Sequence, residues 1–175
     1  TYYTDFSLWD TYRTLHPLLT LLYPEIQLDM LKSLTAMGRD GGFMPRWPMA
    51  IGYTGGMVGD SANIVFADSW VKGLRDFDLR EAYDNMRLTA MEPTPDGAPY
   101  GGRSGIDEFI TLGWMPIESG GASASWTMEM AYDDYGLALL AEALGETEDA
   151  SAFLERSRNW RNLYDSESEF LLGRY

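Results

Sequence analysis

The chain opens with two amphipathic stretches that predict an antiparallel helix pair. Between residues 8 and 22, leucines and Tyr12 recur at alternating spacings of four and three, the period of one helix face. We expect Pro17 to kink this helix, because a break there, the alternative, would leave a helix of only about six residues. Pro24 suits the first turn of a second helix, which should close at glycines 38, 41 and 42. Its expected buried stripe is Ile26, Met30, Leu34 and Met37.

A second helix pair is predicted beyond a loop. Residues 42–59 mix prolines, glycines and aromatic residues, a composition typical of a long loop. Asp60 or Ser61 should then cap a third helix, and Asp78 with Glu81 three residues later forms a capping box for a fourth. The residues expected to face the core are Ile64, Ala67, Val71 and Leu74 in the third helix, and Tyr83 and Met86 in the fourth.

A third pair follows a Gly- and Pro-rich connection from about residue 93 to 124. Ser125 should open an apolar fifth helix that ends at Gly145, and Thr147 should cap the sixth. The apolar face predicted from there on is Ala150, Phe153, Trp160 and Tyr164. The pairs begin near residues 8, 60 and 125, a repeat of roughly 50 to 65 residues, longer than tetratricopeptide or ankyrin repeats. The expected fold is therefore all-α: an α/α toroid, with about three helix pairs of a six-pair (α/α)6 barrel.

Composition narrows the functions open to the chain. Its 175 residues are 45% apolar, enough to bury a core, and contain no cysteine for disulfides or thiolate metal sites. A net charge of -14 would repel nucleic acids and anionic membranes, so we expect no nucleic-acid partner. We expect no membrane span either, because no apolar run approaches the roughly 20 residues required.

Both ends of the sequence resemble internal points of a longer protein. The chain begins at Thr1 without a signal peptide and stops at Tyr175 within an apolar, extended-looking stretch. Half of a toroid would expose two helix-pair edges, so we expect apolar surface patches larger than the few hundred Å² usual for monomers.

Aromatic and charged residues gather in the long loops and at the helix starts they lead into. Aromatic faces can pack on the C–H faces of a sugar ring, while carboxylates and guanidinium groups bind its hydroxyls. The candidates are Trp9, Asp10, Arg46, Trp47, Tyr53, Asp60 and Glu118. Structural alternatives stay open: Asp10 and Arg13 as a surface ion pair, Trp47 as a loop anchor and Asp60 as a helix cap.

Two adjacent carboxylates, Asp133 and Asp134, lie in the most apolar predicted helix, where a buried charge needs a partner. We expect an arginine of a neighbouring helix to pair with them; contact with an ion or substrate is the alternative. His16 is the sole histidine, so we expect neither a multi-histidine zinc site nor serine–histidine catalysis within this segment, and we expect it to pack between helices. No phosphate-binding glycine motif is present.

Several stretches together resemble glycoside hydrolase family 92, the exo-acting α-mannosidases. Residues 6–18 read FSLWDTYRTLHPL and match the family's F-S-x-W-D-T-x-R-x-x-H-P-L segment. Residues 41–47 and 57–59 resemble its next loop, residues 131–135 its A-Y-D-D-aromatic helix, and residues 162–165 with 173–174 its N-x-[FY]-D … G-R stretch. The order and spacing of these stretches agree as well.

The resemblance implies a calcium-dependent, inverting hydrolase that removes terminal α-linked mannose, often α-1,2-linked, from N-glycan-type chains. It also implies an N-terminal β-sandwich before Thr1 and an (α/α)6 barrel that continues beyond Tyr175. Such an enzyme would be secreted or periplasmic, and this segment would pack against the sandwich and the remaining helix pairs. Inversion requires a general acid and a general base about 6.5 to 9.5 Å apart. Calcium would hold mannose hydroxyls through oxygen ligands.

Only part of the family's machinery has counterparts here. The T-E-G-N-x-W, G-N-E-P and G-N-[DE]-D motifs, which carry the acid, the calcium ligands and the base, have no match, so catalytic and metal residues are expected beyond Tyr175. The resemblance carries over Asp10 as a mannose-hydroxyl ligand and Trp9 as its packing neighbour. Arg46, Trp47 and Asp60 are further substrate-binding candidates. Residues 46–56 depart from the family's W-E-x-x-x-N-E-T, which leaves the linkage preference open.

Two other hypotheses remain. One is a different α/α-toroid enzyme, a glucosidase or lyase, whose carboxylates lie in this segment, with Glu118 paired to Asp60 or Asp133. The other is a helical-repeat scaffold that binds a protein partner through its aromatic loops. Under the mannosidase hypothesis the 175-residue segment by itself should be inactive.

Overall fold

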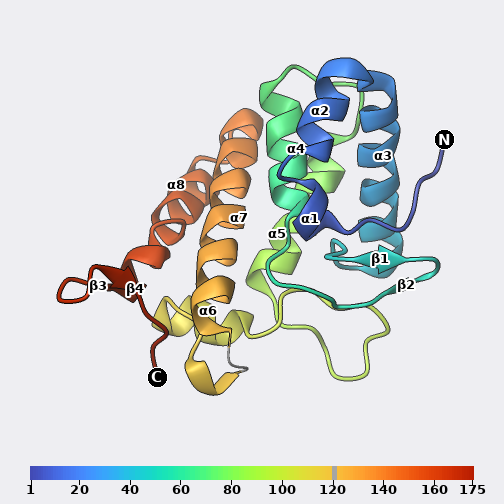
Figure 1. The fold of residues 1–175 in the computed structure, drawn as a ribbon. Coiled ribbons are helices and arrows are strands. Elements are labelled where there is room, and N and C mark those ends of the chain that lie inside the picture. The colour runs from blue at the N-terminus through green and yellow to red at the C-terminus, as the bar shows by residue number, and fades with distance from the viewer. Residues whose placement is uncertain (120–121) are drawn as a thin grey trace.

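The computed structural model describes residues 1–119 and 122–175 and shows an all-α chain with two small hairpins (Figure 1). The helices are α1 (Leu8–Thr11), α2 (Leu15–Leu22), α3 (Pro24–Gly41), α4 (Ala62–Val71), α5 (Leu79–Met91), α6 (Ile106–Leu112), α7 (Ser123–Leu144) and α8 (Thr147–Arg156). Two 3₁₀ turns, η1 (Ile117–Ser119) and η2 (Asn159–Leu163), follow α6 and α8. No helix of the described residues is both long and apolar enough to cross a membrane.

Each hairpin is a two-stranded antiparallel ribbon. β1 (Pro48–Met49) pairs with β2 (Gly52–Tyr53) inside the predicted loop, with Pro48 opposite Tyr53. β3 (Tyr164–Asp165) pairs with β4 (Phe170–Leu171) near the C-terminus, with Tyr164 opposite Leu171. Neither ribbon carries the core.

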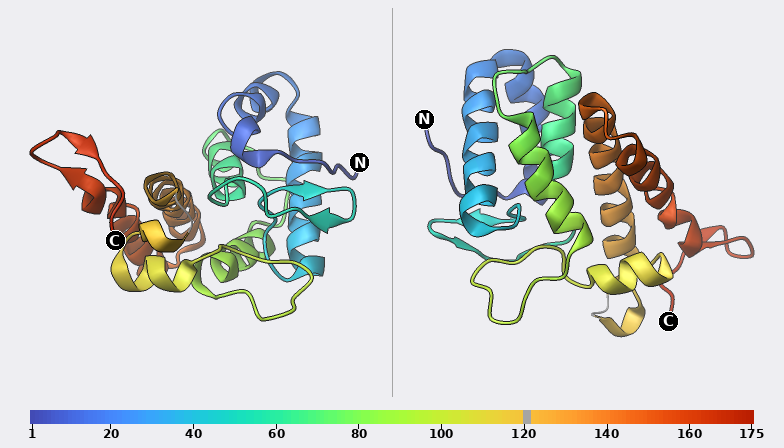
Figure 2. Two further views of the ribbon diagram at one scale, coloured as in Figure 1. Left: turned by 60° about the horizontal axis from the view of Figure 1, so that its bottom comes forward. Right: turned by 180° about the vertical axis from the view of Figure 1, so that it is seen from behind.

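The long helices form two layers, as the views in Figure 2 show. In one layer α4 lies between α2 and α7 and contacts both; in the other α3 contacts α5. α8 packs along α7 and is joined to α5 by hydrogen bonds from Tyr83 and Arg87 to Asp149. The pairs α2–α3, α4–α5 and α7–α8 are therefore the three predicted helix pairs, each contributing one helix to each layer.

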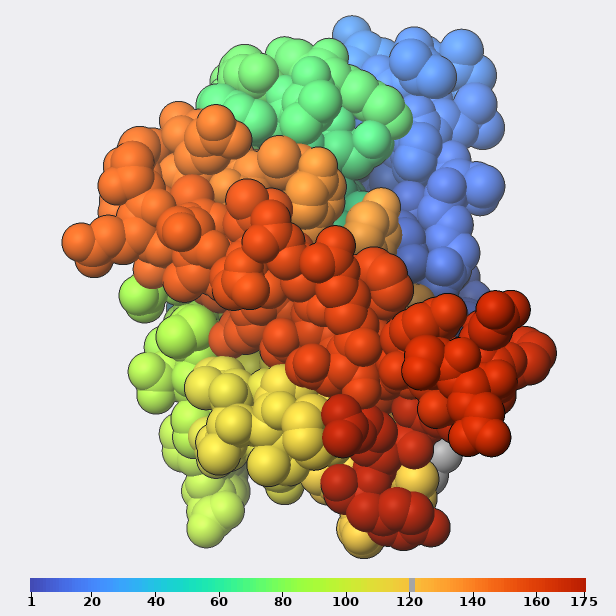
Figure 3. All heavy atoms as spheres, turned by 90° about the vertical axis from the view of Figure 1, so that its left-hand side faces the viewer, coloured from blue at the N-terminus to red at the C-terminus, as the bar shows by residue number. Residues whose placement is uncertain are grey.

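The core lies between these layers. Its largest cluster draws on α3, α4, α5 and α7, and six consecutive residues of α4, from Ala62 to Ala67, are buried. A second cluster places Ile106 and Phe109 of α6 against Met130 of α7. In Figure 3 the C-terminal residues, drawn in orange to red, lie across one side of the molecule, with the yellow residues around α6 below them.

The first helix differs from the prediction. It is not one kinked helix: α1 ends at Thr11, a turn follows, and α2 begins at Leu15. A proline ring clashes with the carbonyl four residues earlier, here that of Arg13, so a helix cannot run through this point unstrained. Pro17 instead occupies the first turn of α2, where its missing N–H is not needed.

Helix ends were predicted with mixed success. The Asp78 cap is confirmed, since its Oδ1 accepts the Glu81 N–H at 2.9 Å. The stops of α3 and α7 are confirmed as well, with left-handed Gly42 (φ +84°) and Gly145 (φ +79°). The Thr147 cap is wrong, because Thr147 is already helical and makes no cap hydrogen bond. Ser61 stands at the cap position of α4, but its hydroxyl does not cap the helix.

Some predicted packing positions are also wrong. Val71 is 65% exposed, whereas Leu74 packs against the core as predicted, although it lies beyond the end of α4. α8 stops at Arg156, so Trp160 and Tyr164 lie beyond it and are exposed. In α3, Leu34 and Met37 are buried as predicted, whereas Ile26 and Met30 are only partly buried. α7 begins two residues earlier than predicted, and α6 was missed within the predicted connection.

Candidate functional site

The N-terminal half of α7 receives both chain segments that carry the predicted site residues. Glu129 and Asp133 lie one helical turn apart on this helix and therefore share a face. The α1 segment reaches Glu129, and the residues before α4 reach Asp133. α7 is thus the element that fixes these two segments relative to each other.

The α1 segment is held by a stack of side chains that ends on Glu129. The Arg13 guanidinium carbon lies 4.5 Å from the centroid of the Trp9 ring and 4.6 Å from that of Tyr12. Arg13 Nη2 donates to Glu129 Oε1 at 3.0 Å, and the Tyr12 hydroxyl donates to Oε2 at 3.3 Å. Burial and the neighbouring Glu129 carboxylate raise the pKa of Tyr12, which keeps the hydroxyl a donor. Asp10 stands in the same turn with its side chain exposed.

The residues before α4 approach α7 through a backbone contact. The Asp60 N–H donates to Asp133 Oδ2 at 2.7 Å. Gly59 makes this approach possible: its φ is +73°, and a Cβ there would lie 2.7 Å from Asp133 Oδ2 and 3.0 Å from Glu129 Cβ. Burial, followed by the negative charge of Asp60, raises the pKa of Asp133 well above its usual value. Asp133 therefore tends to keep its proton in the folded protein.

A buried ion cluster lies behind this contact. Asp134 accepts hydrogen bonds from Arg103 Nη1 at 2.8 Å and from Arg156 Nε at 2.6 Å and Nη2 at 2.9 Å. Arg103 Nη2 also lies 3.0 Å from Asp60 Oδ1, and the Arg103 side chain is fully buried. Burial lowers the pKa of Arg103, but the Asp134 and Asp60 carboxylates outweigh it and raise that pKa. The predicted pairing of the Asp133–Asp134 motif with arginine is confirmed for Asp134.

Arg46 enters the same region from the loop before α4. Its guanidinium carbon lies 5.0 Å from the centroid of the Trp126 ring on α7, and its Nη2 donates to the Gly55 carbonyl. Nε and Nη1 are buried, with no hydrogen-bond partner among the described residues. Burial lowers the pKa of Arg46, while Asp60 and Asp133 oppose that shift. Arg46 thus keeps unused donors close to two carboxyl groups.

The structure separates the predicted candidates into two groups. Trp9, Asp10, Arg46 and Asp60 all belong to the segments that converge on α7. Trp47 fits the loop-anchor alternative, since its carbonyl accepts from the Thr54 N–H and its ring lies under Gly56.

Tyr53 lines a small pocket together with Arg46, and Glu118 has no side-chain hydrogen bond or ion pair among the described residues. The Tyr53 hydroxyl donates to the carbonyls of Met37 and Phe43, which gives it a structural role. Glu118 is exposed on η1. His16 is buried, with its Nδ1 2.9 Å from Gln27 Oε1, so its predicted role in helix packing is confirmed.

Sequence reasoning missed Glu129, Arg103 and Trp126 and misjudged Arg13. Arg13 pairs with Glu129, so the alternative of an Asp10–Arg13 surface pair is not what the structure shows. The spacing of Glu129 four residues before Asp133 was a usable signal, because it places both carboxyl groups on one face of α7. Nothing local marks Arg103, which reaches Asp134 from the middle of a glycine-rich loop.

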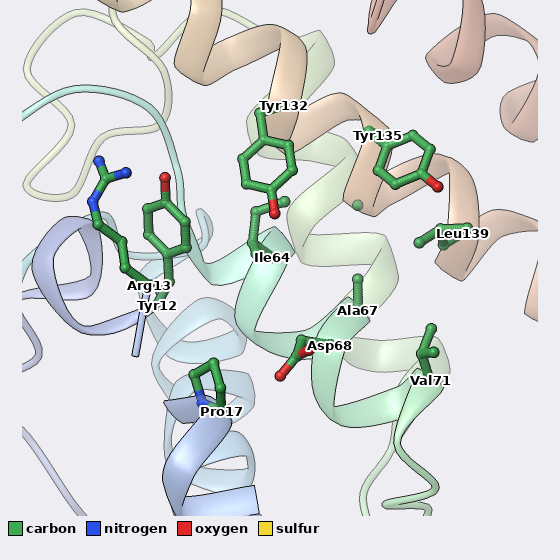
Figure 4. A pocket seen from close by; sticks show the side chains of 11 residues that line it. Tyr12, Arg13, Pro17, Ile64, Ala67, Asp68, Val71, Tyr132, Tyr135 and Leu139 are labelled. Carbon is green, nitrogen blue, oxygen red and sulfur yellow. The ribbon is translucent and has the colours of Figure 1, made fainter. Parts of the chain in front are cut away.

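A groove of about 360 Å³ runs beside the α1 turn between α2, α4 and α7 (Figure 4). Tyr12 and Arg13 stand at one end of it, and Val71 and Leu139 line the other. The rings of Tyr12 and Tyr132 approach to 6.0 Å between centroids across it. Tyr132 and Tyr135 are 46% and 44% exposed, so an aromatic wall of α7 faces solvent here.

Within residues 1–119 and 122–175, no group of three or more His, Asp or Glu side chains is arranged to hold a metal ion. Asp60 and Asp134 are paired with arginines, and Asp133 accepts a backbone N–H. Each of these three carboxyl groups is therefore engaged by a partner within the protein.

Comparisons with known proteins show the family to which the chain belongs. Residues 1–175 match the model of the glycosyl hydrolase family 92 catalytic domain. Among solved structures, a family 92 α-mannosidase of Bacteroides thetaiotaomicron is similar at 36% identity and a TM-score of 0.89 over 99% of this chain and 23% of its own. That enzyme has also been solved in complex with mannoimidazole. A family 92 inverting mannosidase from the same organism is similar at 33% identity and a TM-score of 0.91, with the same coverage of 99% and 23%.

A curated relative extends the similarity to a fungus. An uncharacterized secreted glycosidase of Arthroderma benhamiae is 29% identical over 145 residues, which is 76% of this chain and 18% of that protein. The chain thus spans less than a quarter of the length of each of these three relatives. Its three helix pairs are part of an α/α barrel, and the chain belongs to the glycosyl hydrolase family 92 catalytic domain family.

Proposed function

We propose that the protein containing this chain is an exo-acting α-mannosidase that releases terminal α-linked mannose, α-1,2-linked in the first instance, from N-glycan-type oligosaccharides. The observation that carries the proposal is the α1 turn, where an exposed Asp10 stands beside a Trp9 ring that is fixed by the Arg13 stack. Membership of the family and the two similar mannosidases support the choice of mannose.

In this proposal the chain binds the sugar rather than cleaving it. The exposed Asp10 carboxylate accepts hydrogen bonds from neighbouring mannose hydroxyls, and Trp9 offers an apolar face to the ring. Arg46, whose Nε and Nη1 are buried, supports the site by packing on Trp126, and Asp60 holds the preceding loop against α7. Trp47 has only an anchoring role.

The chemistry would follow an inverting course, as in the similar inverting mannosidase of Bacteroides thetaiotaomicron. A general acid protonates the leaving oxygen while a general base activates water on the opposite face of the sugar. We propose that the acid, the base and the calcium ligands come from other parts of the protein. Calcium, when bound, would hold mannose hydroxyls and favour a distorted ring.

Membership of the family also supports a proposal for the parts of the protein that pack against this chain. A β-sandwich domain and further helix pairs would complete the barrel, and the apolar groove along α2, α4 and α7 would face those helices. Exposed apolar side chains such as Leu18 and Leu21 on α2 and Val71 on α4 support this arrangement. A secreted or periplasmic location is proposed from the secreted relative.

The test is sugar release by the full-length protein. It should cleave α-1,2-mannobiose and leave the corresponding α-glucoside and α-galactoside intact, and proton NMR of the first product should show the β-anomer. EDTA should abolish the activity and calcium should restore it. Cleavage of the glucoside alone, or α-anomer as the first product, would contradict the proposal. The Glu118-based glucosidase or lyase has less support, because Glu118 is exposed and no hydrogen bond or ion pair of the described residues joins its side chain to the segments that converge on α7.

A further inference from the structure

Glu129 makes contacts that neither the packing of α7 nor the proposed chemistry requires. It projects from the second turn of α7, with a side chain that is 15% exposed. Both of its carboxylate oxygens are used, one by Arg13 and one by Tyr12, residues more than a hundred positions earlier in the chain. The carboxylate is thus devoted to holding the segment that follows Asp10.

That segment is otherwise fixed by apolar packing, since Phe6, Leu8 and Tyr12 belong to the main core cluster. α1 has only four residues and no side-chain cap, and the chain then turns through residues 12–14 before α2 begins. Leu8 is buried and anchors one side of the turn. On the other side, the Trp9 indole lies against the Arg13 guanidinium, and the Trp9 Nε1 has no hydrogen-bond partner among the described residues. The position of Trp9 therefore depends on where Arg13 is held.

We infer that Glu129 is a positioning residue for mannose binding: it fixes Arg13 and Tyr12, and through them orients the Trp9–Asp10 turn toward the sugar. This inference rests on the proposed function. The carboxylate suits the task, because one planar group accepts both bonds and its charge strengthens the bond from arginine. The neighbouring Gly59 adds to the constraint, since its backbone approaches Glu129 so closely that a Cβ would lie 3.0 Å from the Glu129 Cβ.

The test is Glu129→Gln in the full-length enzyme, with Glu142→Gln as the matched control because Glu142 is an exposed residue of the same helix. The amide removes the charge and one acceptor without changing side-chain size. A displaced binding turn weakens the grip on mannose, so KM should rise roughly tenfold or more, the usual scale for loss of a supporting contact. The melting temperature should stay near that of the wild type, and Glu142→Gln should leave KM unchanged.

A structural role for Glu129 gives a different result. Partial unfolding lowers the amount of active enzyme, and hence the apparent kcat, but leaves KM at the wild-type value. Arg13→Met breaks the same link from its exposed end and should raise KM by a similar factor, which keeps the test valid if Glu129→Gln does not fold. If folded Glu129→Gln has the wild-type KM, the positioning role of Glu129 is wrong, but the proposed function is not affected. A wild-type protein that cleaves no α-mannoside overturns the proposed function.

Discussion

The buried cluster around Asp134 allows a sharp prediction about stability. Asp134 is completely buried and accepts three hydrogen bonds from two arginines, one from the loop before α6 and one from the end of α8. Asp134→Asn keeps the shape but removes the charge and turns an amide N–H₂ toward donors. Arg103, itself fully buried, would keep only its contact with Asp60 at 3.0 Å.

The size of the effect follows from that burial. Removing one partner of a buried ion pair costs about 3 to 5 kcal/mol, because the remaining charge stays desolvated without compensation. Arg156 makes the destabilisation smaller, because its side chain is 12% exposed and it also donates to the Ala90 carbonyl. We therefore expect the free energy of unfolding to fall by about 3 kcal/mol, near the lower end of that range.

Urea unfolding followed by tryptophan fluorescence measures this loss. Asp76→Asn is the control, because the Asp76 side chain is 85% exposed in its pair with Lys32. Such a surface pair contributes at most about 1 kcal/mol. If Asp134→Asn lost no more stability than the control, the cluster would not hold the 92–105 loop and α8 to α7 in the way described.

Three further results are expected. Because the pKa of Asp133 is raised by burial and by Asp60, its favourable contribution is complete below the unfolded value of about 3.9 and is lost as pH rises through the folded pKa. Asp133→Asn should therefore gain stability relative to the wild type between pH 4 and 8, and a constant difference in urea midpoint would refute this. Gly59→Ala should destabilise by about 1 to 3 kcal/mol more than Gly97→Ala, which has a similar φ (+75° against +73°) but open space around it; equal melting temperatures would exclude the proposed clash. Glu118→Gln should change kcat/KM by no more than about twofold, and a loss of a thousandfold would favour the glucosidase or lyase hypothesis.

The helix pairs were predictable because each helix carries its own local signals and because the pairs recur at a regular spacing along the sequence. The apolar spacing, the Asp78 cap and the glycine stops at residues 42 and 145 are local signals, and each has a direct physical cause. The errors arose where a local signal was ambiguous. With seven residues, α6 is too short to show the repeating apolar pattern of a helix face. Pro17 interrupts the helix at Arg13, four residues before the proline, rather than at the proline itself.

The candidate site was predictable only in part. Aromatic and charged residues in loops pointed to Trp9, Asp10 and Arg46, but the same signal selected Trp47 and Tyr53, which serve the loop. The partners that hold the site in place were invisible because they are distant in the chain: Glu129 lies 116 residues from Arg13. A single sequence cannot pair such residues without a fold that brings α1 and α7 together.

The most direct test of the central claim is mannose release from α-1,2-mannobiose by the full-length protein and by its Asp10→Ala variant. Asp107→Ala is the control, because Asp107 is an exposed residue of α6. The expected result is activity in the wild type and in the control, and a loss in kcat/KM of at least roughly a hundredfold in Asp10→Ala at an unchanged melting temperature. Equal activity of Asp10→Ala and the wild type would contradict the role assigned to the α1 turn.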